Sequence, residues 1–199
     1  MALLDVTDLA ACEAAFAEAD AVVHLAADPD PDHGWPDLHR PNVEGAFVVA
    51  QAARSTGVAR LVLASSLQAM SAYDGNHQRR SDDPPRPANL YGATKAWAEA
   101  LGSWVAASSS TSVVALRIGY FSEVPPSGED HTPRNLSAWL SHGDCAELIR
   151  AAVEADVHDF TIINGISANR YRIAELGINE ARIGYRPVDD AWRHLDETD

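Results

Sequence analysis

Short apolar runs alternate along the chain with stretches whose apolar positions recur every three to four residues. Four of the runs are rich in β-branched residues, as expected of strands buried on both faces. They span 21–27, 60–65, 112–118 and 160–164, and residues 1–6 resemble the tail of a further strand. The periodic stretches predict helices, with Asp8 capping the first and Gly57 ending the second. These helices span 9–19, 42–55, 91–107, 145–155 and 172–177.

Strands that alternate with helices favour a parallel sheet covered on both faces. We therefore expect an α/β, Rossmann-like, doubly wound fold with a mainly parallel sheet. The 199 residues suffice for a single domain, 1–199, with a small C-terminal substrate-side segment at about 120–199. Loops are expected at 28–41, 66–90 and 123–135, and the length of the second favours a functional role.

Charge restricts the partners of this protein. The chain carries 29 acidic and 15 basic residues, a formal net charge of −14 with neutral histidines. This charge repels nucleic acid and anionic membranes, and Arg79-Arg80 is the only basic cluster, so neither partner is expected. No apolar stretch reaches about 18 residues, so the sequence predicts no membrane span. The two cysteines, Cys12 and Cys145, are isolated and favour the reducing cytoplasm.

Candidate chemistry lies at Tyr91 and Lys95, with Ser66 at the end of a predicted strand. Lys95 is the only lysine among the 15 basic residues. On a helix the two positions are one turn apart, so we expect the ammonium to stabilise the phenolate and to lower the pKa of Tyr91 from about 10. With the Ser66 hydroxyl, this set suits proton and hydride transfer at a carbonyl carbon. The alternative is a surface lysine beside a half-buried tyrosine.

Other motifs are less convincing. Residues 28–32 resemble the start of a calcium loop, but His33 and His39 stand where such a loop needs glycine and glutamate. The eight histidines lack the spacing of zinc ligands, so we predict no metal site. Ser65-Ser66 lacks the G-x-S-x-G turn of many hydrolases.

Several segments together resemble the extended short-chain dehydrogenase/reductase superfamily, which includes NAD-dependent epimerases and dehydratases. They are DVTD (5–8), HLAADP (24–29), PNVEGAF (41–47), LASS (63–66), NLYGATK (89–95) and LRIG (116–119). Two more, LSAWLSHGDCAELIRAAVEA (136–155) and INGIS (163–167), resemble the branch of uronate dehydrogenases and NAD-dependent glucose-6-phosphate dehydrogenases. The resemblance covers essentially the whole chain. It implies an NAD(P)-binding domain that oxidises the anomeric carbon of a sugar or sugar acid with NAD and yields a lactone.

The same resemblance implies roles for individual residues. Ser66 would hydrogen-bond the reacting oxygen, Tyr91 would take the anomeric hydroxyl proton, and Lys95 would tune Tyr91 and hold the nicotinamide ribose. The cofactor would also meet Asp5, Val6, Leu25, Ala26, Ala27, Asp28, Pro29, Asn42 and Tyr120. The sugar would meet Pro29, Ser66, Leu67, Gln68, Phe121 and Arg134. The Arg134 guanidinium suits a carboxylate through two parallel bonds, and the alternative is a solvated loop arginine.

Two features depart from the family pattern. Leu67-Gln68 stands where the branch usually has Asn-His, which leaves the substrate open. The chain also has no G-x-x-G-x-x-G turn, the element on which the pyrophosphate rests at a helix N-terminus. The resemblance thus implies an N-terminally truncated fold, in which either residues 1–6 pair beside the strand at 21–27 or the chain is a fragment. We expect weak or absent NAD binding by these 199 residues, and NADP is not excluded.

Two other interpretations of the function stay open. An epimerase or dehydratase of the same superfamily would use the same Tyr91 and Lys95. A non-catalytic paralogue would instead bind a sugar or a partner protein. In relatives, the helices equivalent to 42–55 and 91–107 pair across a dimer, which implies a homodimer here; alternatively their aromatic residues pack on the chain's own sheet.

Overall fold

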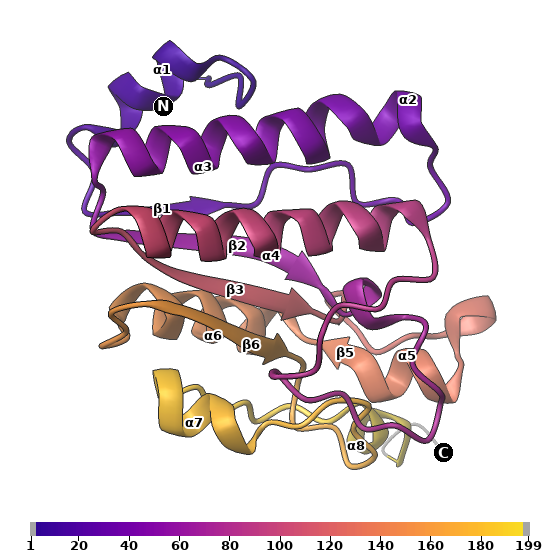
Figure 1. The fold of residues 1–199 in the computed structure, drawn as a ribbon. Helices are drawn as coiled ribbons and strands as arrows, with labels where there is room; N and C mark the ends of the chain where they lie inside the picture. Colours follow the sequence, from indigo (N-terminus) through magenta and orange to yellow (C-terminus); the bar gives the residue numbers. More distant parts are fainter. Residues whose placement is uncertain (1–2, 197–199) are drawn as a thin grey trace.

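The computed structural model describes residues 3–196 and is built on a four-stranded parallel sheet (Figure 1). In spatial order its strands are β1 (Ala21–His24), β2 (Arg60–Ser66), β3 (Ser112–Ile118) and β6 (Phe160–Gly165). Ala21 is paired with Arg60, and Arg60 with Ser112, so neighbouring strands start level with one another. Their carboxyl ends therefore meet at one edge, where α/β sheets bind ligands.

Helices cover both faces of this sheet. On one face pack α1 (Leu9–Phe16), α3 (Gly45–Thr56) and α4 (Leu90–Ser108), with α3 beside α4 (Figure 1). On the other packs α6 (His142–Glu154). Alternate residues of β2 divide between the faces, because Leu61 and Leu63 join the core under α3 and α4, whereas Val62 joins the core under α6. The predicted Rossmann-like fold is confirmed.

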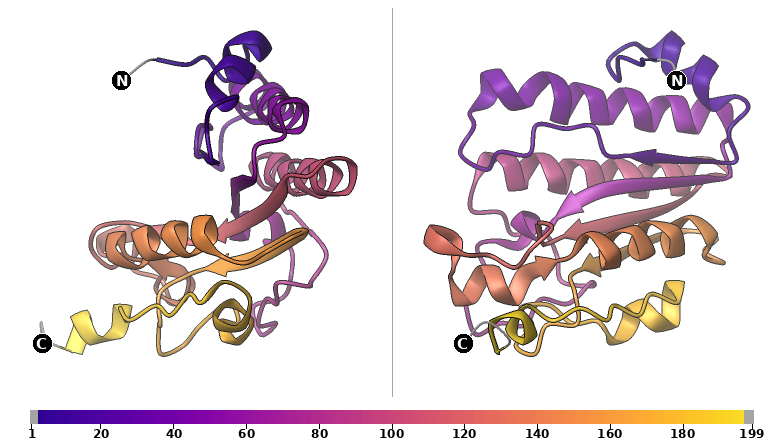
Figure 2. Two further views of the ribbon diagram at one scale, coloured as in Figure 1. Left: turned by 90° about the vertical axis from the view of Figure 1, so that its left-hand side faces the viewer. Right: turned by 180° about the vertical axis from the view of Figure 1, so that it is seen from behind.

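The C-terminal part adds a small second sheet and several short helices. β4 (Tyr120–Phe121) pairs in parallel with β5 (Trp139–Leu140). The remaining short elements are η2 (Leu67–Met70), η3 (Gly128–Asp130), α5 (Pro133–Ala138), α7 (Gly177–Ile183) and α8 (Ala191–Asp196). Figure 2 shows α7 and α8 at the end of the molecule opposite α1. Across residues 3–196, no helix combines the length and apolar character needed to cross a membrane.

Helix ends follow local sequence signals. Asp8 caps α1, its Oδ1 accepting from the Ala11 N–H at 3.0 Å, as predicted. Gly57 ends α3 with φ 67°, a left-handed conformation that favours glycine, also as predicted. Asn89 caps α4 in the same way, its Oδ1 accepting from the Gly92 N–H at 2.7 Å. This last cap fixes where α4 begins and thereby where its first-turn side chains lie.

The helix predicted to begin at Asn42 begins earlier. α2 (Trp35–Leu38), the π-helical η1 (His39–Glu44) and α3 follow one another without a break, so the expected loop 28–41 is shorter. Pro36 lies in the first turn, where its missing N–H costs no helical hydrogen bond. Pro41 lies within the π-helical segment and donates no backbone hydrogen bond there.

The N-terminal strand expectations are wrong. Residues 3–6 form no strand, and residues 1–2 lie outside the described range. In the described part of the chain β1 pairs with β2 alone, so residues 3–6 do not pair beside it. β1 ends at His24 rather than Ala27, and its residues are half-buried because nothing described here covers its second edge.

The prediction of a helix at 172–177 is also wrong. The loop predicted at 123–135 ends earlier than expected. Ala174 forms a parallel bridge with Arg79, whose N–H donates to the Ile173 carbonyl at 2.9 Å. This long-range pairing holds the segment extended, and α7 begins only at Gly177. α5 begins at Pro133 inside the expected loop, because the Thr132 hydroxyl caps it.

Candidate active site

A cavity of about 840 Å³ lies at the carboxyl edge of the sheet. The ends of β2 and β3, the start of α4 and the loop after β1 contribute to its wall. Most residues predicted for the site line it: Leu25, Ala27, Pro29, Ser66, Leu67, Gln68, Tyr91, Lys95, Tyr120, Phe121 and Arg134. The volume is typical of a small-molecule site. The three candidate catalytic residues therefore share one cavity.

Ser66 is the last residue of β2, and backbone groups orient its hydroxyl. Its Oγ accepts from the Gln68 N–H at 3.1 Å and donates to the Ile118 carbonyl at 3.4 Å. The residue is only 8% exposed. Because Ile118 ends the neighbouring strand, these contacts hold the hydroxyl at the sheet edge that borders the cavity.

Tyr91 lies in the first turn of α4, close to Ser66. Gly92 permits this approach, because a Cβ there would lie 2.3 Å from the Gln68 carbonyl oxygen. Tyr91 is buried, and burial raises the pKa of its phenol, while a hydrogen bond with Ser66 acts in the opposite direction. The two hydroxyls are thus hydrogen-bonding neighbours at the cavity wall.

Lys95 stands one turn further along α4. Its Nζ is 5.5 Å from the centroid of the Tyr91 ring, within the range of a cation–π contact. The same Nζ donates to the Ala64 carbonyl in β2 at 3.0 Å. Burial lowers the pKa of Lys95 to about 8, so the ammonium is still mostly charged at pH 7.

The expectation that Lys95 lowers the pKa of Tyr91 is wrong for this structure. The pKa of Tyr91 is raised, because desolvation of the phenolate is the largest effect and the charge of Asp28 adds to it. The ammonium of Lys95 donates a hydrogen bond to the Ala64 carbonyl and lies over the face of the Tyr91 ring. The phenol is therefore protonated at neutral pH in this structure.

Asn42 links the loop after β1 to α4. Its Oδ1 accepts from the Asp28 N–H at 2.7 Å, and its Nδ2 donates to the Asp28 carbonyl at 2.9 Å and to Thr94 Oγ1 at 3.3 Å. Asn42 and Ala26 border a small void beside the main cavity, with Lys95 between the two spaces. These predicted cofactor residues therefore support the cavity wall rather than line the main cavity.

Asp5 and Val6 lie outside the cavity lining. The Asp5 carboxylate pairs with Arg40 at 3.0 Å, and hydrogen bonds from Thr7 hold the pKa of this carboxyl below its usual range. Val6 packs against the start of α3, where a Cβ on Gly45 would approach its Cγ2 to 2.9 Å. Their contact with an adenine stays a prediction.

Three of the predicted substrate residues come from segments that follow β2 and β3 in the chain. Gln68 accepts from the Asn89 Nδ2 at 3.3 Å through its Oε1. Phe121 is half exposed and stacks on His142 with ring centroids 4.7 Å apart. Arg134 lies in the first turn of α5 and is exposed at the cavity wall. The structure brings these side chains together, and their roles stay predictions.

Arg79 is a charged cavity residue that the sequence did not mark as part of a site. Arg79 lines the same cavity although it belongs to the long segment between β2 and α4. It is 3% exposed, which is unusual for an arginine outside a buried ion pair. The sequence marked it only as half of a basic pair, because no periodicity places a residue of an irregular loop.

The cavity fits the nicotinamide end of a dinucleotide. It combines Tyr91 and Lys95 with apolar side chains such as Leu25 and Ile118, at the sheet edge where such ligands bind. Residues 3–196 contribute no glycine-rich turn for the pyrophosphate. The weak NAD affinity expected for that reason stays a prediction. No group of three His, Cys, Asp or Glu side chains that could hold a metal ion is found over the same range.

Known proteins resemble this chain over nearly its whole length. The profile of the NAD dependent epimerase/dehydratase family matches residues 1–142. L-arabinose 1-dehydrogenase (NAD(P)(+)) of Haloferax volcanii is 38% identical over 95% of this chain and 82% of its own. NAD-dependent glucose-6-phosphate dehydrogenase of the same organism is 36% identical over 94% and 75%, respectively. Uronate dehydrogenase of Pseudomonas putida is 30% identical over 94% and 67%.

Solved structures agree with these relatives. Uronate dehydrogenase from Agrobacterium tumefaciens superposes with a TM-score of 0.86 at 29% identity, over 100% of this chain and 73% of its own, and a mutant of it was solved with NAD. UDP-glucose 4-epimerase of Thermus thermophilus, at 23% identity and a TM-score of 0.67, shares the fold over 92% of this chain and 69% of its own. With the family profile over most of its length and relatives at this identity, the chain belongs to the NAD dependent epimerase/dehydratase family.

Proposed function

We propose that this protein is an NAD-dependent oxidoreductase that oxidises the anomeric carbon of a sugar or sugar acid to a lactone. One observation carries the proposal: Ser66, Tyr91 and Lys95 border a single cavity at the carboxyl edge of the sheet. The relatives at 30% identity or more are dehydrogenases of L-arabinose, glucose 6-phosphate and uronate, which supports this substrate class.

In this proposal the phenol of Tyr91 first releases its proton to solvent, and the resulting phenolate receives the proton of the anomeric hydroxyl while the carbon–hydrogen bond at the same carbon breaks. Ser66, which is hydrogen-bonded to the phenol, also holds the reacting oxygen. The ammonium of Lys95 lies over the Tyr91 ring and stabilises this phenolate against the effect of burial. Each group thus acts on the same oxygen or on its proton.

Bound NAD would supply the acceptor for the hydride that leaves the anomeric carbon. The nicotinamide end would lie beside Lys95 and Tyr91, and the dinucleotide would follow Leu25, Ala27 and Pro29 in the loop after β1. Asn42 would keep this loop in position through its paired hydrogen bonds with the backbone of Asp28.

Two alternatives make different predictions. An epimerase or dehydratase would use the same Tyr91 and Lys95, but the epimerase structure resembles this chain only in fold. A non-catalytic paralogue would bind sugar without turnover. A dehydrogenase accumulates NADH together with the oxidised sugar. An epimerase converts the sugar without accumulating NADH, and a binding protein forms no product and no NADH.

The decisive assay follows NADH at millimolar NAD with L-arabinose, glucuronate, galacturonate and glucose 6-phosphate. The wild type should form NADH with at least one of them, and Tyr91→Phe should abolish it. Tyr185→Phe is the matched control, since it removes a buried phenol that donates to the Ile166 carbonyl outside the cavity lining. A folded wild type that forms no NADH with any sugar, or a fully active Tyr91→Phe, contradicts the proposal.

We also propose a homodimer formed through α3 and α4, in the reducing cytoplasm. Phe47, Trp97 and Trp104 on these helices are 45%, 41% and 37% exposed, which supports an apolar contact surface. Cys12 and Cys145 are free thiols, which supports the compartment. Light scattering after gel filtration should give twice the mass of the chain; a monomer at micromolar concentration contradicts the dimer.

A further inference from the structure

A second cavity adjoins the candidate active site. Its volume is about 510 Å³, and Arg79, Arg134 and Ile173 line both spaces. The remaining residues of its lining are Tyr73, Gly75, Pro133, Ser137, Tyr171 and Arg172. The two arginines therefore stand on the boundary between the catalytic cavity and its neighbour.

The second cavity is positively charged in a strongly acidic protein. Its lining contains three arginines and neither aspartate nor glutamate among the described residues. The first cavity likewise has no acidic side chain in its described lining, although the chain carries 29 acidic residues against 15 basic ones. Cations that line a cavity without carboxylates in its described wall favour an anionic ligand.

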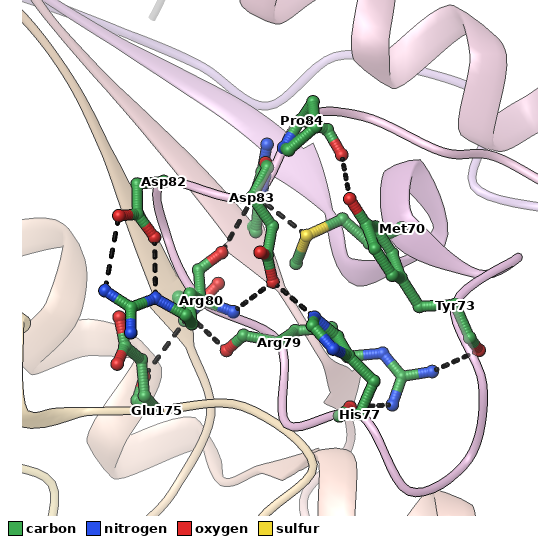
Figure 3. A network of polar contacts seen from close by, with 11 residues as sticks. Met70, Tyr73, His77, Arg79, Arg80, Asp82, Asp83, Pro84 and Glu175 are labelled. Carbon is green, nitrogen blue, oxygen red and sulfur yellow. Dashed lines mark hydrogen bonds and ion pairs between the residues drawn. The ribbon is translucent and has the colours of Figure 1, made fainter.

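Hydrogen bonds to the loop backbone hold the side chain of Arg79. Its Nη1 and Nη2 donate to the carbonyls of His77 and Tyr73 at 3.2 and 3.3 Å (Figure 3). Its backbone is fixed by the bridge to Ala174. The neighbouring loop backbone is held by the buried Arg117, which donates to the carbonyls of Arg80 and Asp83.

No described carboxylate hydrogen-bonds to the Arg79 guanidinium. Asp83 attracts this guanidinium electrostatically, while its Oδ2 accepts from His77 Nε2 at 2.7 Å and from the Arg80 N–H at 2.8 Å (Figure 3). Burial lowers the pKa of Arg79, and the charge of Arg134 lowers it further. A buried cation next to a second cation is costly unless an anion lies between them.

We propose that Arg79, Arg134 and Arg172 bind the phosphate group of a sugar phosphate whose anomeric carbon lies at Tyr91. A single arginine satisfies a carboxylate through two parallel bonds, whereas a phosphate dianion offers three acceptor oxygens and twice the charge. The sugar ring then occupies the 840 Å³ cavity and its phosphate crosses the Arg79–Arg134 boundary. This inference rests on the proposed sugar dehydrogenase function and specifies its substrate class.

The test is a calorimetric titration without cofactor, so that it does not depend on turnover. Glucose 6-phosphate, inorganic phosphate, glucuronate and glucose are titrated into the full chain. We expect glucose 6-phosphate to bind at least tenfold more tightly than glucuronate or glucose, and inorganic phosphate to compete with it. Because the second ionisation of a phosphate monoester falls near pH 6, binding should be weaker at pH 5.5 than at pH 7.5.

Variants assign the effect to the arginines. Arg79→Met and Arg172→Met should each weaken the binding of glucose 6-phosphate at least tenfold, and Arg172→Met, which lies outside the lining of the catalytic cavity, should leave glucose binding unchanged. Arg54→Met is the matched control, because it removes the same charge from α3, outside both linings. Should Arg79→Met not fold, the exposed Arg172 decides the question.

Several outcomes overturn the phosphate site. They are equal affinity for glucuronate and glucose 6-phosphate, absence of phosphate competition, and wild-type affinity in a folded Arg172→Met. If the protein binds glucose 6-phosphate in this arginine-dependent way but forms no NADH with any of the sugars tested, the dehydrogenase function is refuted and the phosphate site is retained. NADH formation from neutral or carboxylated sugars alone, without phosphate binding, retains the function and refutes the site.

Discussion

A buried ion pair between α4 and β3 should make a large contribution to the stability of this protein. Glu99 is 3% exposed and Arg117 is fully buried. Glu99 Oε1 accepts from Ser65 Oγ at 2.6 Å and from Arg117 Nε at 2.8 Å, and Oε2 accepts from Arg117 Nη2 at 2.9 Å. Glu99→Gln keeps the volume of the side chain but leaves the Arg117 cation uncompensated in the core.

The expected magnitude follows from this geometry. Removing one partner of a buried pair costs about 3–5 kcal/mol, and we expect about 3 kcal/mol because glutamine can still accept one hydrogen bond. For a domain of this size that corresponds to a Tm about 6–12 °C lower. Urea unfolding followed by tryptophan fluorescence, together with a thermal scan, measures both values.

Glu147→Gln is the matched control. Glu147 pairs with Arg150 on the exposed surface of α6, where removal of a partner costs about 1 kcal/mol or less. If Glu99→Gln destabilises no more than Glu147→Gln, the reasoning from burial is refuted. Because Arg117 also holds the loop that carries Arg79, Glu99→Gln should lower kcat/KM as well.

Further predictions concern individual side chains. Tyr91→Phe should lower kcat by about 10²–10⁴-fold without loss of Tm, since it removes only the proton acceptor; an unchanged kcat would exclude that role. Burial lowers the pKa of Lys95 to about 8 from 10.5, so the unfolded chain binds more protons between those pH values and the wild type should gain stability as pH rises through them. Lys95→Met should not gain stability over this pH range, and at pH 7 it should be inactive and about 1–3 kcal/mol more stable than the wild type. The same pH dependence of the free energy of unfolding in both proteins, measured with urea, would contradict this prediction. Burial and the charge of Lys95 lower the pKa of His24 from 6.5 to about 4. The wild type should therefore lose about 3 kcal/mol of its free energy of unfolding as the pH falls through that range. A His24→Gln variant that loses just as much would exclude His24 as the cause.

Local signals explain what the sequence could reveal of the site. Tyr91 and Lys95 are predictable because helical spacing alone puts positions four apart on one face, and Asn89 marks where that helix starts. Ser66 is predictable because an apolar β-branched run ends there. These inferences need no information about the rest of the chain.

Long-range packing explains what the sequence could not reveal. The direction of the Tyr91 pKa depends on burial by several elements, and the Ala64 carbonyl that accepts from Lys95 comes from a distant strand. The position of Arg79 is set by Ala174, nearly a hundred residues further along the chain, and no periodicity signals such a pairing. The same bridge replaced the helix expected at 172–177.

The most direct test of the proposed chemistry follows deuterium from the anomeric carbon. A sugar that the wild type oxidises, deuterated at C1, is incubated with millimolar NAD, and the label is located by mass spectrometry. We predict that the deuterium appears in NADH in equal amount to the lactone formed and that Tyr91→Phe transfers it at least about a hundredfold more slowly. Deuterium that remains in the sugar, returns to it with inverted configuration or is released to water would contradict the account.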